Sequence, residues 1–183
     1  MIASFARLQE FVSRRAGLSL DDDKQFLAEA RLAPVARRFG EANVDRLIAR
    51  LTAGDDEIAR AVIDSMTTHE TLFFRDRAPF DFLSGVVLPR LIDKRADERS
   101  IRVWCAGCAT GQEPYSIAII IDEHARALMG WRVEILATDV SRSAIEIARK
   151  GDYNQFEVQR GLPAPLLVRY FGRSGDQIGR AHV

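Results

Sequence analysis

A run of small residues between a buried strand and an apolar helix constrains this chain most. The segment VWCAGCATGQEPYS (103–116) follows the strand-like stretch IRVWC and leads into the helical stretch SIAIII. A second strand, WRVEILATD, comes next, followed by a helical pattern that begins at Ser141 and stops at Gly151. Strand, glycine-containing loop, helix and strand form a βαβ unit with parallel strands. The sequence therefore predicts an α/β sheet that begins near residue 100.

The loop of this unit lies where open α/β sheets bind ligands, outside the carboxyl end of a strand. Gly107 and Gly111 let a ligand approach the backbone closely, and Asp139 ends the second strand, where a carboxylate can accept from two ribose hydroxyls. The loop departs from the full G-x-G-x-x-G pattern, and Glu113 would repel the pyrophosphate of a dinucleotide. These features favour S-adenosylmethionine, which is positively charged and carries no phosphate, over NAD.

The first 66 residues have a different pattern, with apolar residues at helical spacing. We expect four helices, with stops at Gly17 and near Gly54 and with Asp55 as the cap of the fourth. Pro34 is expected to kink or split the second helix, because its ring blocks a backbone hydrogen bond. This part of the chain is therefore predicted to be an all-helical domain.

Composition limits the functional classes. Lys+Arg and Asp+Glu number 26 each, so no global charge draws the chain to nucleic acid. No apolar run is long enough to cross a bilayer, and two cysteines without an export signal indicate a reducing cytoplasm. Cys105 and Cys108 are expected to have packing and loop roles rather than to form a redox pair or a zinc site, since a zinc site would need two further ligands. No metal, no nucleic acid and no membrane insertion are expected.

Several segments carry a family resemblance. TTHETLFFRD, CAGCATGQEPYSIA, ILATDVSRSAIEIARKGDY and LVRYF, together with GLSLDDDKQFLAEARL near the N-terminus, resemble the CheR family of chemotaxis-receptor glutamate O-methyltransferases. The resemblance implies an α/β fold: an N-terminal all-helical domain followed by the first βαβ part of a Rossmann-like methyltransferase domain dependent on S-adenosylmethionine. It also implies methyl transfer from S-adenosylmethionine to glutamate side chains on the cytoplasmic helices of a receptor, for sensory adaptation.

Carried over position by position, the resemblance assigns cofactor contacts to Thr71 and Arg75, between the two domains, and to the acids Glu113 and Asp139. His69 stands where some members have an asparagine ligand, which leaves that contact open. A glutamate carboxylate is already ionised at neutral pH, so attack on a methyl group needs no strong base. Arg75, the expected catalytic residue, would therefore hold a carboxylate of the cofactor or of the substrate rather than exchange a proton.

Each of these residues has a structural alternative. Glu113 can be an acid favoured by the helix dipole, and Asp139 can cap the helix that follows it. Arg75 can be a solvated charge, and His69 a polar residue at a helix end.

Four basic residues, Lys24, Arg31, Arg37 and Arg38, fall in the second helical stretch, which has a single acid of its own. They form either a solvated helix face or a basic surface that meets the glutamate-rich helices of a receptor, and the resemblance favours the second. Nucleic-acid binding is disfavoured because the acids at 21–23 adjoin this stretch and the overall charge is balanced.

We expect four regions: a receptor-facing helical domain (1–66), a linker segment with the cofactor-contacting motif (67–99), the start of the methyltransferase domain (100–177) and a non-native tail (178–183). The tail, IGRAHV, resembles a translated sequencing adapter. Because only two strands of the parallel sheet are visible, we expect an incomplete domain that is inactive by itself. The alternative function is a non-catalytic module that docks on receptors or binds the cofactor.

Overall fold

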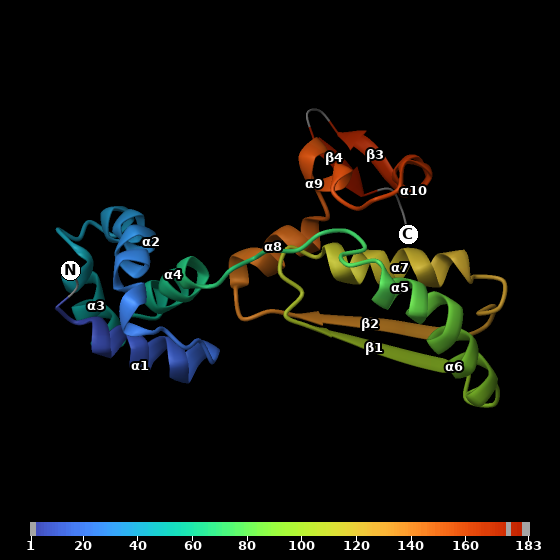
Figure 1. The fold of residues 1–183 in the computed structure, drawn as a ribbon, viewed down its shortest axis with the longest axis horizontal. Helices are drawn as coiled ribbons and strands as arrows, with labels where there is room; N and C mark the ends of the chain where they lie inside the picture. The colour runs from blue at the N-terminus through green and yellow to red at the C-terminus, as the bar shows by residue number, and fades with distance from the viewer. Residues whose placement is uncertain (1–2, 175–176, 181–183) are drawn as a thin grey trace. The chain divides into compact units, whose positions relative to one another are not determined.

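The computed structural model describes residues 3–174 and 177–180. The chain divides into two compact units, Met1–Thr68 with Val140–Ser143 and His69–Asp139 with Ala144–Val183. The first unit is built of helices, and the second contains both sheets (Figure 1). None of the helices among the described residues is long and apolar enough to span a membrane.

The helical unit packs its elements around one apolar core. Its elements are α1 (Phe5–Ala16), the 3-10 turn η1 (Asp22–Lys24), α2 (Gln25–Arg38), α3 (Val44–Thr52) and α4 (Asp56–Met66). Each helix contributes one apolar stripe, as the helical spacing predicts. Side chains with no exposed surface include Leu8, Val12, Leu32, Leu47, Ile48, Ile58 and Val62.

The ends of these helices follow local chemistry. Gly17 ends α1 in the left-handed conformation, with φ of 65°, which glycine adopts without steric cost. Pro34 does not split α2, which is continuous from Gln25 to Arg38. Pro34 has no N–H to donate to the carbonyl of Ala30, four residues earlier. Both residues are exposed, so the Ala30 carbonyl can bind water instead.

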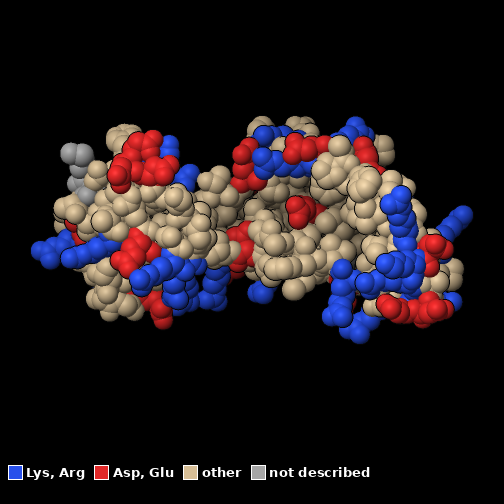
Figure 2. All heavy atoms as spheres, turned by 60° about the horizontal axis from the view of Figure 1, so that its bottom comes forward, with Lys and Arg blue, Asp and Glu red and all other residues tan. Residues whose placement is uncertain are grey.

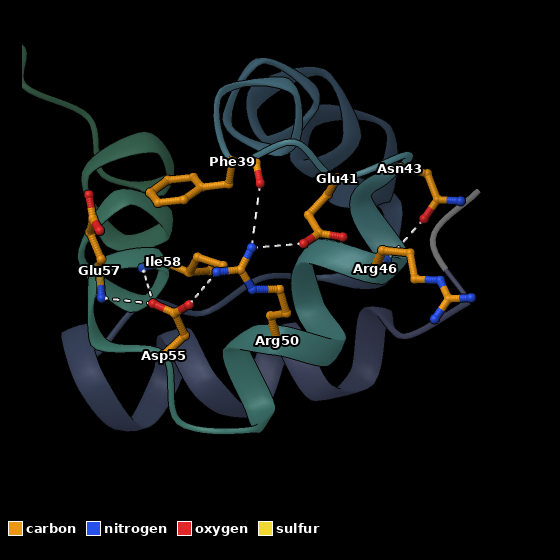
Figure 3. Close-up of polar contacts among 8 residues, drawn as sticks. All are labelled: Phe39, Glu41, Asn43, Arg46, Arg50, Asp55, Glu57 and Ile58. Atoms are coloured by element: carbon orange, nitrogen blue, oxygen red, sulfur yellow. Dashed lines mark hydrogen bonds and ion pairs between the residues drawn. The ribbon is translucent and has the colours of Figure 1, made fainter.

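One arginine joins three parts of the helical unit (Figure 3). Arg50 on α3 donates to the carboxylates of Glu41, at 2.9 Å, and Asp55, at 2.6 Å. The other oxygen of Asp55 accepts the backbone N–H groups of Glu57 and Ile58, both at 3.1 Å. The predicted cap of the fourth helix is therefore confirmed, and Arg50 ties that cap to the loop after α2. The Ile58 N–H and then Arg50 lower the pKa of Asp55.

This lowered pKa predicts a pH-dependent contribution to stability. The folded form binds the Asp55 proton less tightly than the unfolded form, so the stabilisation is present above the ordinary carboxyl pKa and is lost as pH falls through the lowered one. Asp55→Ala should lower the urea midpoint of the helical unit at neutral pH, and the difference from wild type should shrink in acid. Asp55→Asn, which keeps a cap acceptor, is the matched control. A difference for Asp55→Ala that is the same at both pH values would contradict this account.

The second unit is α/β, which confirms the predicted fold class. Its elements are α5 (Ala78–Phe82), the π-helical turn η2 (Leu83–Val87), α6 (Leu88–Lys94), β1 (Ser100–Ala106), α7 (Gln112–Glu123), β2 (Arg132–Thr138), α8 (Arg142–Lys150, whose first two residues group with the helical unit), α9 (Gln155–Gln159), α10 (Ala164–Tyr170), β3 (Phe171–Ser174) and β4 (Gln177–Arg180). Strands β1 and β2 pair in parallel from Ser100 opposite Arg132 to Ala106 opposite Thr138.

The two faces of this parallel sheet differ. Cys105 is buried in a cluster with Ile117 of α7, and partly buried side chains of β1, β2, α5, η2, α7 and α8 pack against that cluster. Figure 1 shows α5 and α7 on one side of the sheet. On the opposite face Trp104 is 69% exposed and Leu136 is 60% exposed. Parallel sheets normally have both faces covered, whereas the large apolar side chains of Trp104 and Leu136, beside the charged pair Arg102 and Glu134, have no cover among the described residues.

A small antiparallel pair, β3 and β4, completes the described part of the unit. Tyr153 joins it through a bridge in which its backbone exchanges hydrogen bonds with Ile178 at 3.0 and 2.6 Å. Residues 178–180 of the expected tail thus belong to β4, and residues 181–183 lie outside the described residues. That the tail is non-native, and the expected boundaries at 66, 99 and 177, stay predictions.

Candidate functional site

A cavity of about 380 Å³ lies within the second unit, between the segment that precedes α5 and the start of α7. Its volume is within the range of small-molecule sites. Apolar side chains form part of its wall: Leu72, Pro79, Phe80, Leu83 and Ile117. The same wall contains four of the residues that the sequence predicts for the cofactor: Thr71, Arg75, Gly107 and Glu113.

The loop after β1 is held by the end of β2. The N–H groups of Gly107 and Cys108 both donate to the carbonyl of Thr138, at 2.8 and 3.0 Å. Asp139 accepts the backbone N–H of Ala109 through its carboxylate, at 2.8 Å. Asp139 is not part of the cavity wall. The structure therefore gives it a loop-holding contact, and its cofactor role stays a prediction.

Close packing explains why a glycine stands at position 111. Its φ is 99°, and a Cβ there would come within 2.8 Å of the Ala148 side chain and 2.9 Å of the Tyr153 hydroxyl oxygen. Tyr153 is fully buried and donates from its hydroxyl to the Thr110 carbonyl, at 2.8 Å. These contacts require a glycine whether or not a cofactor approaches, so the predicted cofactor contact of Gly111 is not needed to explain it.

Burial favours the protonated form of both cysteines. Both are free and buried. Burial, followed by the charge of Glu113, raises the pKa of Cys105 to about 12, and burial, followed by the charge of Asp139, raises the pKa of Cys108. The thiolate is the nucleophile and the metal ligand, so these residues supply packing. Across residues 3–174 and 177–180, no three potential metal-ligating side chains come together.

Arg75 lies on an unusual turn. Phe74, Asp76 and Arg77 around it all have positive φ, at 50°, 61° and 42°, which side-chain-bearing residues rarely adopt. Arg75 itself is exposed on the cavity wall, and its Nη1 donates to the Glu70 carbonyl at 2.9 Å. Strained backbone of this kind persists where surrounding contacts determine it and gathers at functional sites.

The residue before this turn anchors it. Phe73 has no exposed surface and meets Tyr153 and Phe171 edge to face, with ring centroids 5.1 and 5.4 Å apart. Sequence reasoning missed this aromatic cluster, because its members are 80 and 98 residues from Phe73 in the chain. The paired aromatics of LFF were the one available signal.

The remaining predicted residues lie elsewhere. His69 is half-buried, outside the cavity wall, and has an interaction partner. Of the basic residues, Lys24 is in η1 rather than α2 and pairs with Asp23 at 3.2 Å. Arg31 donates to the carbonyl of Met66 at 2.9 Å, which holds the end of α4. The predicted substrate role of Arg31 thus competes with a structural one.

Arg37 and Arg38 differ from those two. Both are exposed in the last turn of α2, and the part of the chain that the structure describes records no ion pair for either. On the face shown in Figure 2, basic and acidic side chains lie interspersed, as expected for a chain with balanced charge.

The donor set of the cavity suits one class of ligand. Asp76 and Glu113 offer carboxylates to a cation, and the apolar wall offers a surface for a flat ring. Arg75, whose Nη2 lies 4.0 Å from the carboxylate of Glu70, offers a guanidinium to a carboxylate. A zwitterionic nucleoside with an additional positive charge, as in S-adenosylmethionine, fits this set, whereas a pyrophosphate would meet three acids. A methyltransferase domain that binds S-adenosylmethionine is a class of protein that fits this fold and this cavity.

Comparison with known families agrees. The CheR methyltransferase SAM-binding domain matches residues 69–180, and the CheR methyltransferase all-alpha domain matches residues 3–67. The chain belongs to the CheR methyltransferase family. Its cofactor is therefore S-adenosylmethionine, and the NAD alternative is set aside.

Curated relatives give the same assignment. The chain is 37% identical over 176 residues to chemotaxis protein methyltransferase 1 of Pseudomonas aeruginosa, covering 94% of this chain and 64% of the relative. It is 38% identical over 169 residues to the chemotaxis protein methyltransferase of Vibrio parahaemolyticus, covering 91% of this chain and 60% of the relative. The chain thus spans between 60% and 64% of the length of these relatives.

The cavity predicts the effect of removing one charge. Glu113→Gln in the whole protein should weaken binding of S-adenosylmethionine roughly tenfold or more, because a hydrogen bond to a charged group is lost. Calorimetric titration measures this, and Glu98→Gln, which removes an exposed acid outside the cavity wall, is the control. Wild-type affinity in a folded Glu113→Gln variant would exclude this cavity as the cofactor site.

Proposed function

We propose that the whole protein transfers a methyl group from S-adenosylmethionine to glutamate side chains on the cytoplasmic helices of chemotaxis receptors, and acts in the cytoplasm. The resulting methyl esters would serve sensory adaptation. The observation that carries the proposal is the cavity that unites Thr71, Arg75, Gly107 and Glu113 in a chain of the CheR family. The relatives' names, chemotaxis protein methyltransferase, support a receptor substrate.

The proposed reaction requires little general acid–base catalysis from the protein. S-adenosylmethionine supplies the methyl group when bound. The receptor glutamate is ionised at neutral pH, so the residues of this chain bind, orient and exclude water rather than remove a proton. Glu113 faces positive charge, Arg75 holds a carboxylate, and the apolar wall keeps water from the reacting groups.

Receptor recognition is assigned to the basic residues of the helical unit, Lys24, Arg31, Arg37 and Arg38. Arg37 and Arg38 contribute most, because they are exposed, whereas the guanidinium of Arg31 already donates to the end of α4. Positive charge facing acidic receptor helices speeds encounter and sets orientation.

Charge reversal tests this surface. Arg37→Glu combined with Arg38→Glu in the whole protein should raise the KM for receptor severalfold and leave cofactor affinity unchanged, with a larger effect at low salt. The matched control reverses Arg7 on α1 and Arg46 on α3, which are both exposed. Receptor methylation that responds equally to both pairs would leave α2 as an ordinary solvated face.

The 183-residue chain by itself should not methylate receptor, because Trp104 and Leu136 leave one face of its parallel sheet exposed. The core of the helical unit, by contrast, comes entirely from residues 5–66. Limited proteolysis should therefore leave a fragment that ends between Met66 and Arg99, and transfer of labelled methyl groups should stay at background. Binding of cofactor without turnover would favour the alternative, a non-catalytic receptor-docking or cofactor-binding module. Efficient turnover would contradict the prediction.

A further inference from the structure

Ser116 makes a contact that the reaction outlined above does not use. It has no exposed surface. Its hydroxyl donates to the Gln112 carbonyl one turn earlier in α7, at 2.7 Å, and accepts the backbone N–H of Phe74 at 3.0 Å. The first bond is common for a serine within a helix. The second joins α7 to a segment 42 residues away and uses the acceptor capacity of the same hydroxyl.

The partner of this bond is the residue next to Arg75. The strained turn of Phe74, Asp76 and Arg77 needs contacts on both sides to persist. The buried ring of Phe73 supplies an anchor on one side, and Ser116 holds the backbone N–H of Phe74 itself.

The helix that carries Ser116 also lines the cavity. Glu113 lies one turn before Ser116 and Ile117 follows it, and both belong to the cavity wall with Arg75. The bond between Ser116 and Phe74 therefore ties the turn that bears the cationic group to the helix that bears the anionic one. A shift of one against the other would change the spacing of the two opposite charges around the ligand.

We propose that Ser116 is a positioning residue, which sets Arg75 against Glu113 by holding the Phe74 N–H. This inference rests on the proposed function, because it takes Arg75 as the group that binds the carboxylate of the cofactor.

A double-mutant cycle tests the proposal in the whole protein, with affinity for S-adenosylhomocysteine as the readout. Ser116→Ala should weaken binding roughly five- to tenfold, and Arg75→Ala should weaken it as well. The double variant should bind as Arg75→Ala does, because Ser116 acts through Arg75. Ser65→Ala is the control: its hydroxyl donates to the Arg31 carbonyl at 2.7 Å in the helical unit, and its removal should leave affinity unchanged.

The same bond can be removed from its other end. Replacing the Phe74 amide by an ester deletes the N–H and leaves Ser116 intact, so it decides the question even if Ser116→Ala does not fold. The ester should weaken binding as Ser116→Ala does, and the Phe74 N–H should exchange with solvent faster in Ser116→Ala than in wild type.

The outcomes separate the inference from the proposed function. An equal loss from Ser116→Ala with and without Arg75 would show a general structural role, which overturns the inference and leaves the site in place. Wild-type affinity of Ser116→Ala or of the ester would also overturn it. Wild-type affinity of Arg75→Ala would remove Arg75 from the cofactor site, and the inference would fall with that assignment.

Discussion

The parallel pairing of β1 and β2 is the constraint on which the site depends. It brings the carboxyl ends of two strands to one edge, where the Thr138 carbonyl accepts from both Gly107 and Cys108. The chain must then turn sharply into α7, and that turn places Glu113 on the cavity wall. The register thus fixes the start of the loop, and Asp139 and Tyr153 hold its later residues, Ala109 and Thr110.

Local chemistry in the sequence predicts the parts of the fold that depend on neighbouring residues. The stop at Gly17, the cap at Asp55 and the βαβ order are of this kind. Pro34 shows the limit of a local rule. The helix α2 continues past it because Ala30, whose carbonyl lacks its helical donor, is exposed to water. Gly161 shows what no local rule provides: a Cβ at this position would overlap the Phe73 carbonyl, a contact across most of the second unit's sequence.

For the site, the sequence indicates which residues take part better than it indicates what those residues contact. Glu113 and Arg75 line one cavity: the βαβ order places Glu113 at the carboxyl edge of the sheet, and only the family resemblance pointed to Arg75. Arg31 looks like a surface cation from its neighbours alone, yet its guanidinium holds the end of α4. The hydrogen bond that Ser116 accepts from the Phe74 N–H is likewise not predictable from the sequence. A serine in an apolar helix gives no sign of a partner 42 residues away.

The outer face of the sheet also provides a natural optical probe. The chain has two tryptophans, and Trp104 stands on β1 with its indole N–H donating to the Thr138 hydroxyl, at 3.0 Å. The backbone carbonyl of Thr138 is the same group that holds the loop after β1. The emission of Trp104 thus originates two residue pairs before the last pair of the sheet, Ala106 and Thr138, after which that loop begins. Trp131 is only partly buried in a separate cluster, so replacing it by phenylalanine would leave a single fluorophore that reports on the loop.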